Sequence, residues 1–358
     1  MLKLREEIRT LAEYHPPLGN RDGLRLDFNE NTQGCSPRVL ERLRSLSVED
    51  LARYPVREEG ERIVAAHFGI SPDELLLTNG TDEAIHLICE TYIEPGQEAV
   101  IAVPTFAMFR IYAEAAGAKV IQVRTDDTFR YPTEPALRSI TEHTRLVAIA
   151  NPNNPTGAFV SPADIEQIAR SAPEAAILID EAYFEFCGET MLRRWRDLPN
   201  VFVSRTFSKA YGLAGLRIGV LMGNREEMQW LRRASSPYNL NSVALASLPA
   251  ALADKQYVAG YVQQTLEGRR ELEAELIEWG VRFWPSRANF VLMYLGENCK
   301  PFIQKMRQRG ILVRDRSSDY ACKDCVRITV GIREHNERLL TSMREIFAEL
   351  DMRAKVAR

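Results

Sequence analysis

Short apolar runs recur through the middle of the chain, and amphipathic segments separate them. Runs rich in valine, isoleucine and leucine have the length of strands at 75–78, 99–103, 119–123, 146–150, 176–180 and 201–204. Strands that are apolar on both faces are typical of a parallel sheet buried between helices. The pattern therefore predicts an α/β fold in which a mostly parallel sheet is sandwiched by helices.

Helix signals stand between these runs. Ser161 followed by Pro162 has the hydroxyl cap and the first-turn proline of a helix start. Apolar residues at helical spacing also follow Gly80. Each of these helices connects two strand-like runs, as parallel strands require.

The order of elements changes from about residue 260. A charged helix at 265–278 leads into strand-like runs and helices at 281–284, 288–294, 300–309, 311–314, 326–330 and from 334 onward. Strands and helices mixed in this way predict a smaller α+β domain. We therefore expect a large domain at 41–258, a small C-terminal domain at 259–358, and an N-terminal arm at 1–40. The arm should pack on the small domain or on a partner subunit.

Composition and charge exclude several classes of partner. The 358 residues carry 46 Lys and Arg against 49 Asp and Glu, a net charge of −3. This balance provides no electrostatic attraction to nucleic acid or to an anionic membrane. No apolar run approaches the roughly 20 residues that span a bilayer, and the first residues lack the apolar stretch of a signal peptide. We therefore expect a cytoplasmic protein with neither kind of partner.

Six cysteines are scattered along the chain, and only Cys322 and Cys325 form a CxxC pair. Zinc sites of this type need a second ligand pair, which the sequence lacks. A redox pair normally opens a helix, whereas this pair precedes a strand-like run. The sequence therefore predicts ordinary reduced thiols in a loop and no metal site.

Candidate chemistry is densest after the run at 201–204. Lys209 stands beside the hydroxyls of Thr206 and Ser208, and glycines and Arg217 follow. A lysine amine can bond covalently to an aldehyde cofactor. Hydroxyls and a forked guanidinium suit a phosphate. Alone, the segment is equally compatible with a surface lysine in a polar loop.

Three other segments follow strand-like runs. Asp180 ends one run, where a carboxylate can hold a pyridine nitrogen protonated, and Tyr183 can bond the ring's phenolic oxygen. Asn154 lies in a rigid proline-rich turn, and its amide can reach the same oxygen. Thr81 and Asp82 begin a helix whose N–H groups suit an anion. Singly, these are a helix cap and two common turns.

Together, in this order, the four segments resemble the class I/II aminotransferases, which are fold-type I pyridoxal-phosphate enzymes. The resemblance extends from about Leu26 to Phe347. It implies that Lys209 carries the cofactor, pyridoxal 5′-phosphate, and moves the substrate's α-proton. It further implies cofactor contacts for Tyr54, Thr81, Asp82, Phe106, Asn154, Asp180, Tyr183, Thr206, Ser208 and Arg217, and substrate contacts for Tyr14, Asn29 and Arg327.

Within this family, the chain is most similar to histidinol-phosphate aminotransferases. The segments at 26–37 and 327–334 and the Arg53-Tyr54-Pro55 triplet carry this likeness. In those enzymes the matching tyrosine reaches the phosphate of the neighbouring subunit's cofactor. The resemblance therefore implies a homodimer with shared active sites, which converts histidinol phosphate with 2-oxoglutarate as acceptor.

Departures from the subgroup's pattern leave the substrate open. Phenylalanine occupies positions 106 and 109, where tyrosine is common, and the segment at 317–325 is longer and more charged than expected. Aminotransferases for aromatic or other amino acids and threonine-phosphate decarboxylases have very similar motifs. A cofactor-sensing regulator is a further alternative, but the first motif begins near residue 26 and leaves no room for a preceding DNA-binding domain.

Overall fold

A computed structural model describes residues 2–351 except 12, 14–18 and 20. Its centre is a seven-stranded sheet of order β2-β8-β7-β6-β5-β3-β4, in which β8 alone runs antiparallel to its neighbours. Its strands are β2 (Leu75–Thr78), β3 (Glu98–Val103), β4 (Lys119–Arg124), β5 (Thr144–Ala150), β6 (Ala176–Asp180), β7 (Val201–Thr206) and β8 (Gly219–Met222). The predicted mostly parallel sheet is confirmed, although β8 was not predicted.

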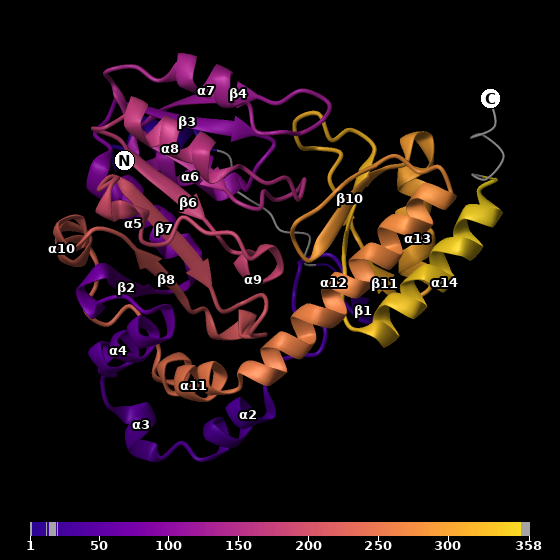
Figure 1. The fold of residues 1–358 in the computed structure, drawn as a ribbon, viewed down its shortest axis with the longest axis horizontal. Coiled ribbons are helices and arrows are strands. Elements are labelled where there is room, and N and C mark those ends of the chain that lie inside the picture. The colour runs from indigo at the N-terminus through magenta and orange to yellow at the C-terminus, as the bar shows by residue number, and fades with distance from the viewer. Residues whose placement is uncertain (1, 12, 14–18, 20, 352–358) are drawn as a thin grey trace.

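Helices cover both faces of this sheet (Figure 1). Successive strand residues enter opposite cores, because side chains alternate along a strand. Ile177 and Ile179 face one core, and Leu178 faces the other. The helices of this part of the chain are α2 (Pro37–Arg44), α3 (Val48–Ala52), α4 (Arg57–Phe68), α5 (Gly80–Tyr92), α6 (Ala107–Ala116), α7 (Thr133–Ser139), α8 (Pro162–Ser171), α9 (Phe184–Cys187), α10 (Arg225–Ala234) and α11 (Ser242–Ala253).

A second, antiparallel sheet of order β12-β13-β10-β9 lies beside the C-terminal helices. Its core joins Val291 and Ile328 to Phe302, Leu339 and Phe347. The elements are α12 (Lys255–Glu278), β9 (Phe283–Trp284), β10 (Phe290–Tyr294), α13 (Cys299–Gln308), β11 (Ile311–Leu312), β12 (Arg314–Asp315), β13 (Cys325–Thr329) and α14 (Arg333–Glu349).

Helix α12 connects the two parts of the fold. It begins at Lys255, ten residues before the predicted helix start, and Asp254 caps it by accepting a hydrogen bond from the Tyr257 N–H. The helix runs from beside α11 to the α13 and α14 group (Figure 1). It is therefore continuous across the 258/259 boundary, and the division into domains stays a prediction.

The N-terminal segment packs on the C-terminal part of the same chain. After the short α1 (Glu6–Thr10), β1 (Leu24–Arg25) pairs in parallel with β11. Leu26 is fully buried in the C-terminal core, and its carbonyl accepts a hydrogen bond from Thr329. This pairing brings residues 27–32 to the edge of the large sheet.

Candidate active site

A cavity of 900 Å³ opens where the parallel strands of the large sheet end. Ala150, Asp180 and Thr206, which line it, are the last residues of β5, β6 and β7. Ligand sites of open α/β sheets lie outside the carboxyl ends of their strands. The topology thus places polar side chains from distant parts of the sequence in one hollow.

Most of the predicted site residues meet in this cavity. Those that line it are Asn29, Thr81, Asp82, Phe106, Asn154, Asp180, Tyr183, Thr206, Ser208, Lys209, Arg217 and Arg327. Tyr54 lies elsewhere: it is 76% exposed, and its ring stacks on Tyr238 at 4.3 Å between centroids. Tyr14 lies outside the described residues.

The sheet side of the cavity, here called the sheet wall, comprises Thr81, Asp180, Thr206, Ser208, Lys209 and Arg217. Within it, Asp180 accepts a hydrogen bond of 2.8 Å from the Ser204 hydroxyl of the neighbouring strand. Burial raises the pKa of Asp180 to about 7, although the Ser204 hydroxyl acts in the opposite direction. A buried carboxylate of this kind gains from a cationic partner, which would restore its charge.

Lys209 lies in the loop that follows β7. Its Nζ donates to the Phe28 carbonyl at 2.9 Å and stands 5.9 Å from the centre of the Tyr183 ring. Burial lowers the pKa of Lys209 to about 8, and the charge of Arg327 acts in the same direction. A neutral amine, which is the nucleophilic form, is therefore accessible near neutral pH.

The end of the cavity beside α5 is shaped for an anion. The Ser208 hydroxyl is buried without a hydrogen-bond partner among the described residues. A Cβ atom at Gly219 would lie 3.0 Å from the Thr81 nitrogen, so only glycine leaves the start of α5 open. Because β8 runs antiparallel, Arg217 before it reaches this end, where it pairs with Asp82 at 2.9 Å.

Four arginines from the N-terminal segment and the small antiparallel sheet or its flanks also line the cavity: Arg21, Arg314, Arg316 and Arg327, here called the arginine wall. Arg21 pairs with Asp27 at 2.9 Å, and Arg316 pairs with Asp319. Arg314 lies opposite Arg327 in the antiparallel register of β12 and β13. Several guanidinium groups at one end of a cavity favour a substrate with a multiply charged anionic group.

Of these arginines, only Arg327 was predicted from the sequence. Arg314 and Arg316 are two positions apart at the end of the strand-like run at 311–314, and extended backbone at this spacing would place both side chains on one face. That spacing was the available signal. It was weak because β12 contains only two residues, and because no local pattern shows that β12 pairs with β13.

Arg327 also fixes a residue of the asparagine turn. Its guanidinium donates to the Asn154 side-chain oxygen and to the Asp27 carbonyl, the latter at 2.6 Å. The amide nitrogen of Asn154 must then point away from Arg327. Burial lowers the pKa of Arg327 to about 9, and Arg316 adds to this effect.

The two phenylalanines that depart from the subgroup's pattern have different surroundings. Phe106 lines the cavity, whereas Phe109 is fully buried in the core beneath α6. Of these two positions, therefore, only 106 is one where the missing tyrosine hydroxyl could have contacted a bound ligand.

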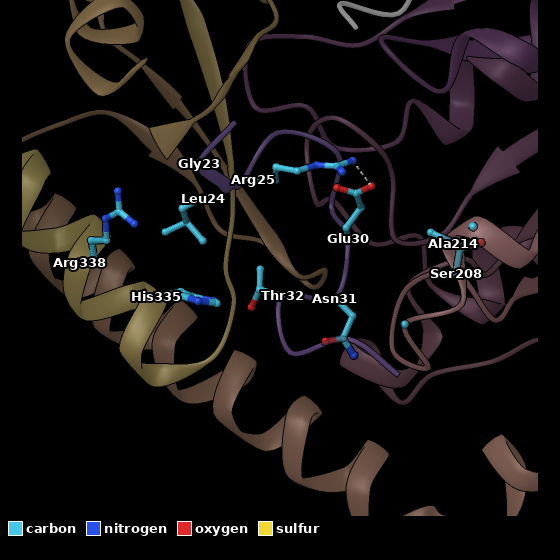
Figure 2. A pocket seen from close by; sticks show the side chains of 12 residues that line it. Gly23, Leu24, Arg25, Glu30, Asn31, Thr32, Ser208, Ala214, His335 and Arg338 are labelled. Carbon is cyan, nitrogen blue, oxygen red and sulfur yellow. Dashed lines mark hydrogen bonds and ion pairs between the residues drawn. The ribbon is translucent and has the colours of Figure 1, made fainter. Parts of the chain in front are cut away.

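A second hollow of 520 Å³ adjoins the cavity (Figure 2) and shares Arg25, Glu30, Ser208 and Ala214 with it. Figure 2 shows the 30–32 segment between His335 of α14 and the loop that carries Ser208. Arg25 and Glu30 pair across this segment. The N-terminal segment is therefore a partition within the site.

The CxxC pair lies apart from this chemistry. Both thiols are free and buried beside Phe129, Trp284 and Leu292, and Cys325 is the first residue of β13 rather than part of a loop. Within the described ranges, no cluster of three or more His, Cys, Asp or Glu side chains suits a metal ion. No helix in the same ranges is both long and apolar enough to cross a membrane.

Comparison with known proteins connects this geometry to one family. The sequence profile of "Aminotransferase class I and II" matches residues 21–343. A histidinol-phosphate aminotransferase of Geobacillus sp. (strain WCH70) is 33% identical, with 97% of this chain and 99% of the relative covered.

Solved structures share the fold. Histidinol-phosphate aminotransferase from Sinorhizobium meliloti, solved with pyridoxal-5′-phosphate, superposes with a TM-score of 0.87 at 25% identity, covering 98% of this chain and 99% of the other. L-threonine-O-3-phosphate decarboxylase from Porphyromonas gingivalis reaches 0.79 at 21% identity, with 91% and 99% covered. The second likeness concerns the fold alone, because one fold hosts several reactions.

Proposed function

This chain belongs to the aminotransferase class I and II family and is a transaminase that uses pyridoxal 5′-phosphate; on that premise we propose that histidinol phosphate is its amino donor and 2-oxoglutarate its acceptor. One observation carries this proposal: Lys209, Asp180 and the arginine wall line one cavity. The first two suit the cofactor, and the third suits a phosphorylated donor. Relatives of that specificity, about one third identical over nearly the whole chain, support the same substrate.

The residues present fit the cofactor. The unpartnered Ser208 hydroxyl, the N–H groups at the start of α5 and Arg217 would hold its phosphate. Asp180 would pair with its ring nitrogen, and Tyr183 and Asn154 would bond its phenolic oxygen. Phe106 would cover one face of the ring, and Thr206 braces the loop by accepting a hydrogen bond from the Ser208 N–H at 3.1 Å.

When bound, the cofactor supplies an aldehyde that condenses with amines and a ring that withdraws electrons from the substrate's α-carbon. Lys209 Nζ would take the proton from that carbon, as a base, and deliver it to the carbon of the former aldehyde, as an acid. A pKa of about 8 suits both roles near neutral pH. Asp180 keeps the ring nitrogen positively charged through the exchange.

The arginine wall would orient both substrates. Arg327, which is buried and forked, would bind the anionic group nearest the reacting amine. Arg314 and Arg316 would add charge that a phosphate uses more fully than a carboxylate does. The same wall would thus accept histidinol phosphate in one half-reaction and 2-oxoglutarate in the other.

We further propose that the active enzyme is a homodimer in which Tyr54 reaches the partner's cofactor phosphate. Tyr54 stacks on Tyr238, and exposed apolar side chains surround it in the sequence at Val48, Leu51 and Val56. A second copy covering this surface would bury these groups. The exposure of Tyr54, and its absence from the residues that line its own cavity, support a role across an interface.

The test is a two-substrate assay of glutamate formation from histidinol phosphate and 2-oxoglutarate. Histidinol, which lacks the phosphate, should react with a kcat/KM at least about 100-fold lower, because the arginine wall would lose a charged partner. Equal rates with the two donors would contradict the role of the arginine wall. Release of carbon dioxide from threonine phosphate, without glutamate formation, would favour decarboxylation instead.

A further inference from the structure

Asn29 lines the larger cavity and directly precedes the 30–32 segment. It is 1% exposed, and its backbone φ of 56° lies in the left-handed region, which asparagine tolerates better than most residues. A strained residue at a site edge persists only where its surroundings hold it. The hydrogen bonds of Asn29 therefore show which neighbours hold it in this conformation.

One side of Asn29 is fixed to the small antiparallel sheet and its neighbours. Its backbone N–H donates to the Thr329 hydroxyl at 3.0 Å, and that hydroxyl donates to the Asn29 side-chain oxygen at 3.2 Å. Its carbonyl accepts a hydrogen bond of 3.1 Å from Asn289. In this arrangement the oxygen end of the Asn29 amide faces Thr329.

The nitrogen end of the amide faces the large sheet. It donates to the Tyr183 hydroxyl oxygen at 2.9 Å. A phenol has a single proton, and a hydroxyl oxygen that accepts from Asn29 must direct its own proton elsewhere. Because Tyr183 is 5% exposed and lines the cavity, that direction is into the cavity.

We propose that Asn29 is a positioning residue, which aims the Tyr183 hydroxyl proton at the phenolic oxygen of the bound cofactor. In this proposal the amide acts through Tyr183. The family resemblance implies a different role for Asn29, a direct contact with the substrate. This inference rests on the proposed role of Tyr183 beside the cofactor. Phe28, the residue before Asn29, contacts the same group of residues, because its carbonyl accepts a hydrogen bond from Lys209 Nζ.

The hydrogen bond has a spectroscopic consequence. A proton donated to the phenolic oxygen stabilises its negative charge, so the nitrogen that joins Lys209 to the cofactor loses its proton at lower pH. Removing or reversing the donation should raise the pH midpoint of the cofactor's visible band. Ionisable groups facing Tyr183 and Lys209 also set that midpoint, namely Asp82, Asp180, Arg217, Glu30, Arg316 and Arg327.

The experiment is a double-mutant cycle in the holoenzyme, read by pH titration of the visible band. Asn29→Asp keeps the shape but accepts the Tyr183 proton, and it should raise the midpoint by about one unit, the worth of one hydrogen bond. Tyr183→Phe should raise it similarly. When Phe already occupies position 183, Asn29→Asp should raise the midpoint by less than it does beside Tyr183, because only the effect of the added charge remains.

An equal Asn29→Asp shift with Tyr183 and with Phe at position 183 would overturn the proposal. If Asn29→Asp fails to fold, Asn29→Gly replaces it, because glycine adopts a φ of 56° without strain. Its shift should likewise be present with Tyr183 and absent in Tyr183→Phe; equal shifts would again overturn the proposal. Absence of the visible band in the wild-type holoenzyme would instead contradict the proposed function.

Discussion

The sheet wall and the arginine wall are built by different means, although they line the same cavity. Each residue of the sheet wall ends a strand of the large sheet or lies in a loop or helix start next to one, so the sheet fixes its position. The arginine wall depends on β12 pairing with β13 and on the N-terminal segment pairing with β11. The sheet wall therefore suits chemistry common to every amino donor, and the arginine wall suits the choice among donors.

The largest expected effect is on the sheet wall. Lys209→Ala should remove the covalent attachment and the proton carrier together, lowering kcat by about 10⁴-fold or more with every donor. The visible band of the attached cofactor should also vanish. Lys300→Ala, at an exposed position on α13, is the matched control and should change neither. A variant at Lys209 that keeps the ordinary spectrum would refute the assignment.

Asp180→Ala should still bind the cofactor but lose about 10³-fold in kcat, again with every donor, because the ring nitrogen is no longer held positive. Ser204→Ala removes the hydroxyl that donates to Asp180 yet keeps the carboxylate, and should cost far less. Steady-state rates with two donors give the comparison. Wild-type turnover in Asp180→Ala would contradict the electrostatic role of this carboxylate.

A variant of the arginine wall should discriminate between donors. Arg316→Ala should raise KM for histidinol phosphate about tenfold, the worth of one charged hydrogen bond, and change KM for glutamate much less. Arg344→Ala, which breaks an exposed pair with Glu275 on α12, is the control for loss of a surface arginine. An equal rise in KM for both donors would contradict the proposal that the arginine wall selects the donor.

The pH dependence of cofactor attachment isolates the sheet wall from any donor. Only the neutral Lys209 amine attacks an aldehyde, and its pKa is lowered to about 8. The rate of attachment to the apoenzyme should therefore rise about tenfold between pH 7 and pH 9 and then level off. Stopped-flow absorbance measures this. A rate that keeps rising toward pH 10.5 would indicate an ordinary lysine.

The smallest expected signal concerns the partner subunit. Mixing Tyr54→Phe with Lys209→Ala should restore about a quarter of wild-type activity, since half the dimers are hybrids and each has one intact site. Activity is measured against each variant alone, with a tagged subunit to verify exchange. Absence of recovery despite exchange would argue against a site shared between subunits.

Local patterns predicted the sheet wall because its residues stand where strand-like runs end. Asp180 and Lys209 could be placed at one sheet edge before any coordinates, since parallel strands share their carboxyl edge. The strand β8 was missed, and with it the reason that Arg217 reaches this edge. Its four residues follow a glycine-rich loop, and its antiparallel direction has no local signal.

The arginine wall and Asn29 were beyond reach of local patterns for a different reason. Arg316 follows β12, whose pairing with β13 is a long-range contact, and it pairs with Asp319 of the charged segment at 317–325. The resemblance implies a substrate contact for Asn29, which stays a prediction; the hydrogen bonds of its amide to Tyr183 and Thr329 depend on long-range contacts that no local pattern shows. Phe109 differs in the other direction: the sequence marked it as a departure near the site, but its side chain belongs to the core.

The most direct test of the account is a half-reaction without acceptor. Holoenzyme is mixed separately with histidinol phosphate, glutamate, phenylalanine and threonine phosphate, and the cofactor's visible band is followed. We predict that histidinol phosphate and glutamate both discharge the band as the cofactor takes their amino group. Discharge by glutamate or phenylalanine but not by histidinol phosphate would contradict the proposed donor and direct attention to the arginine wall and Phe106.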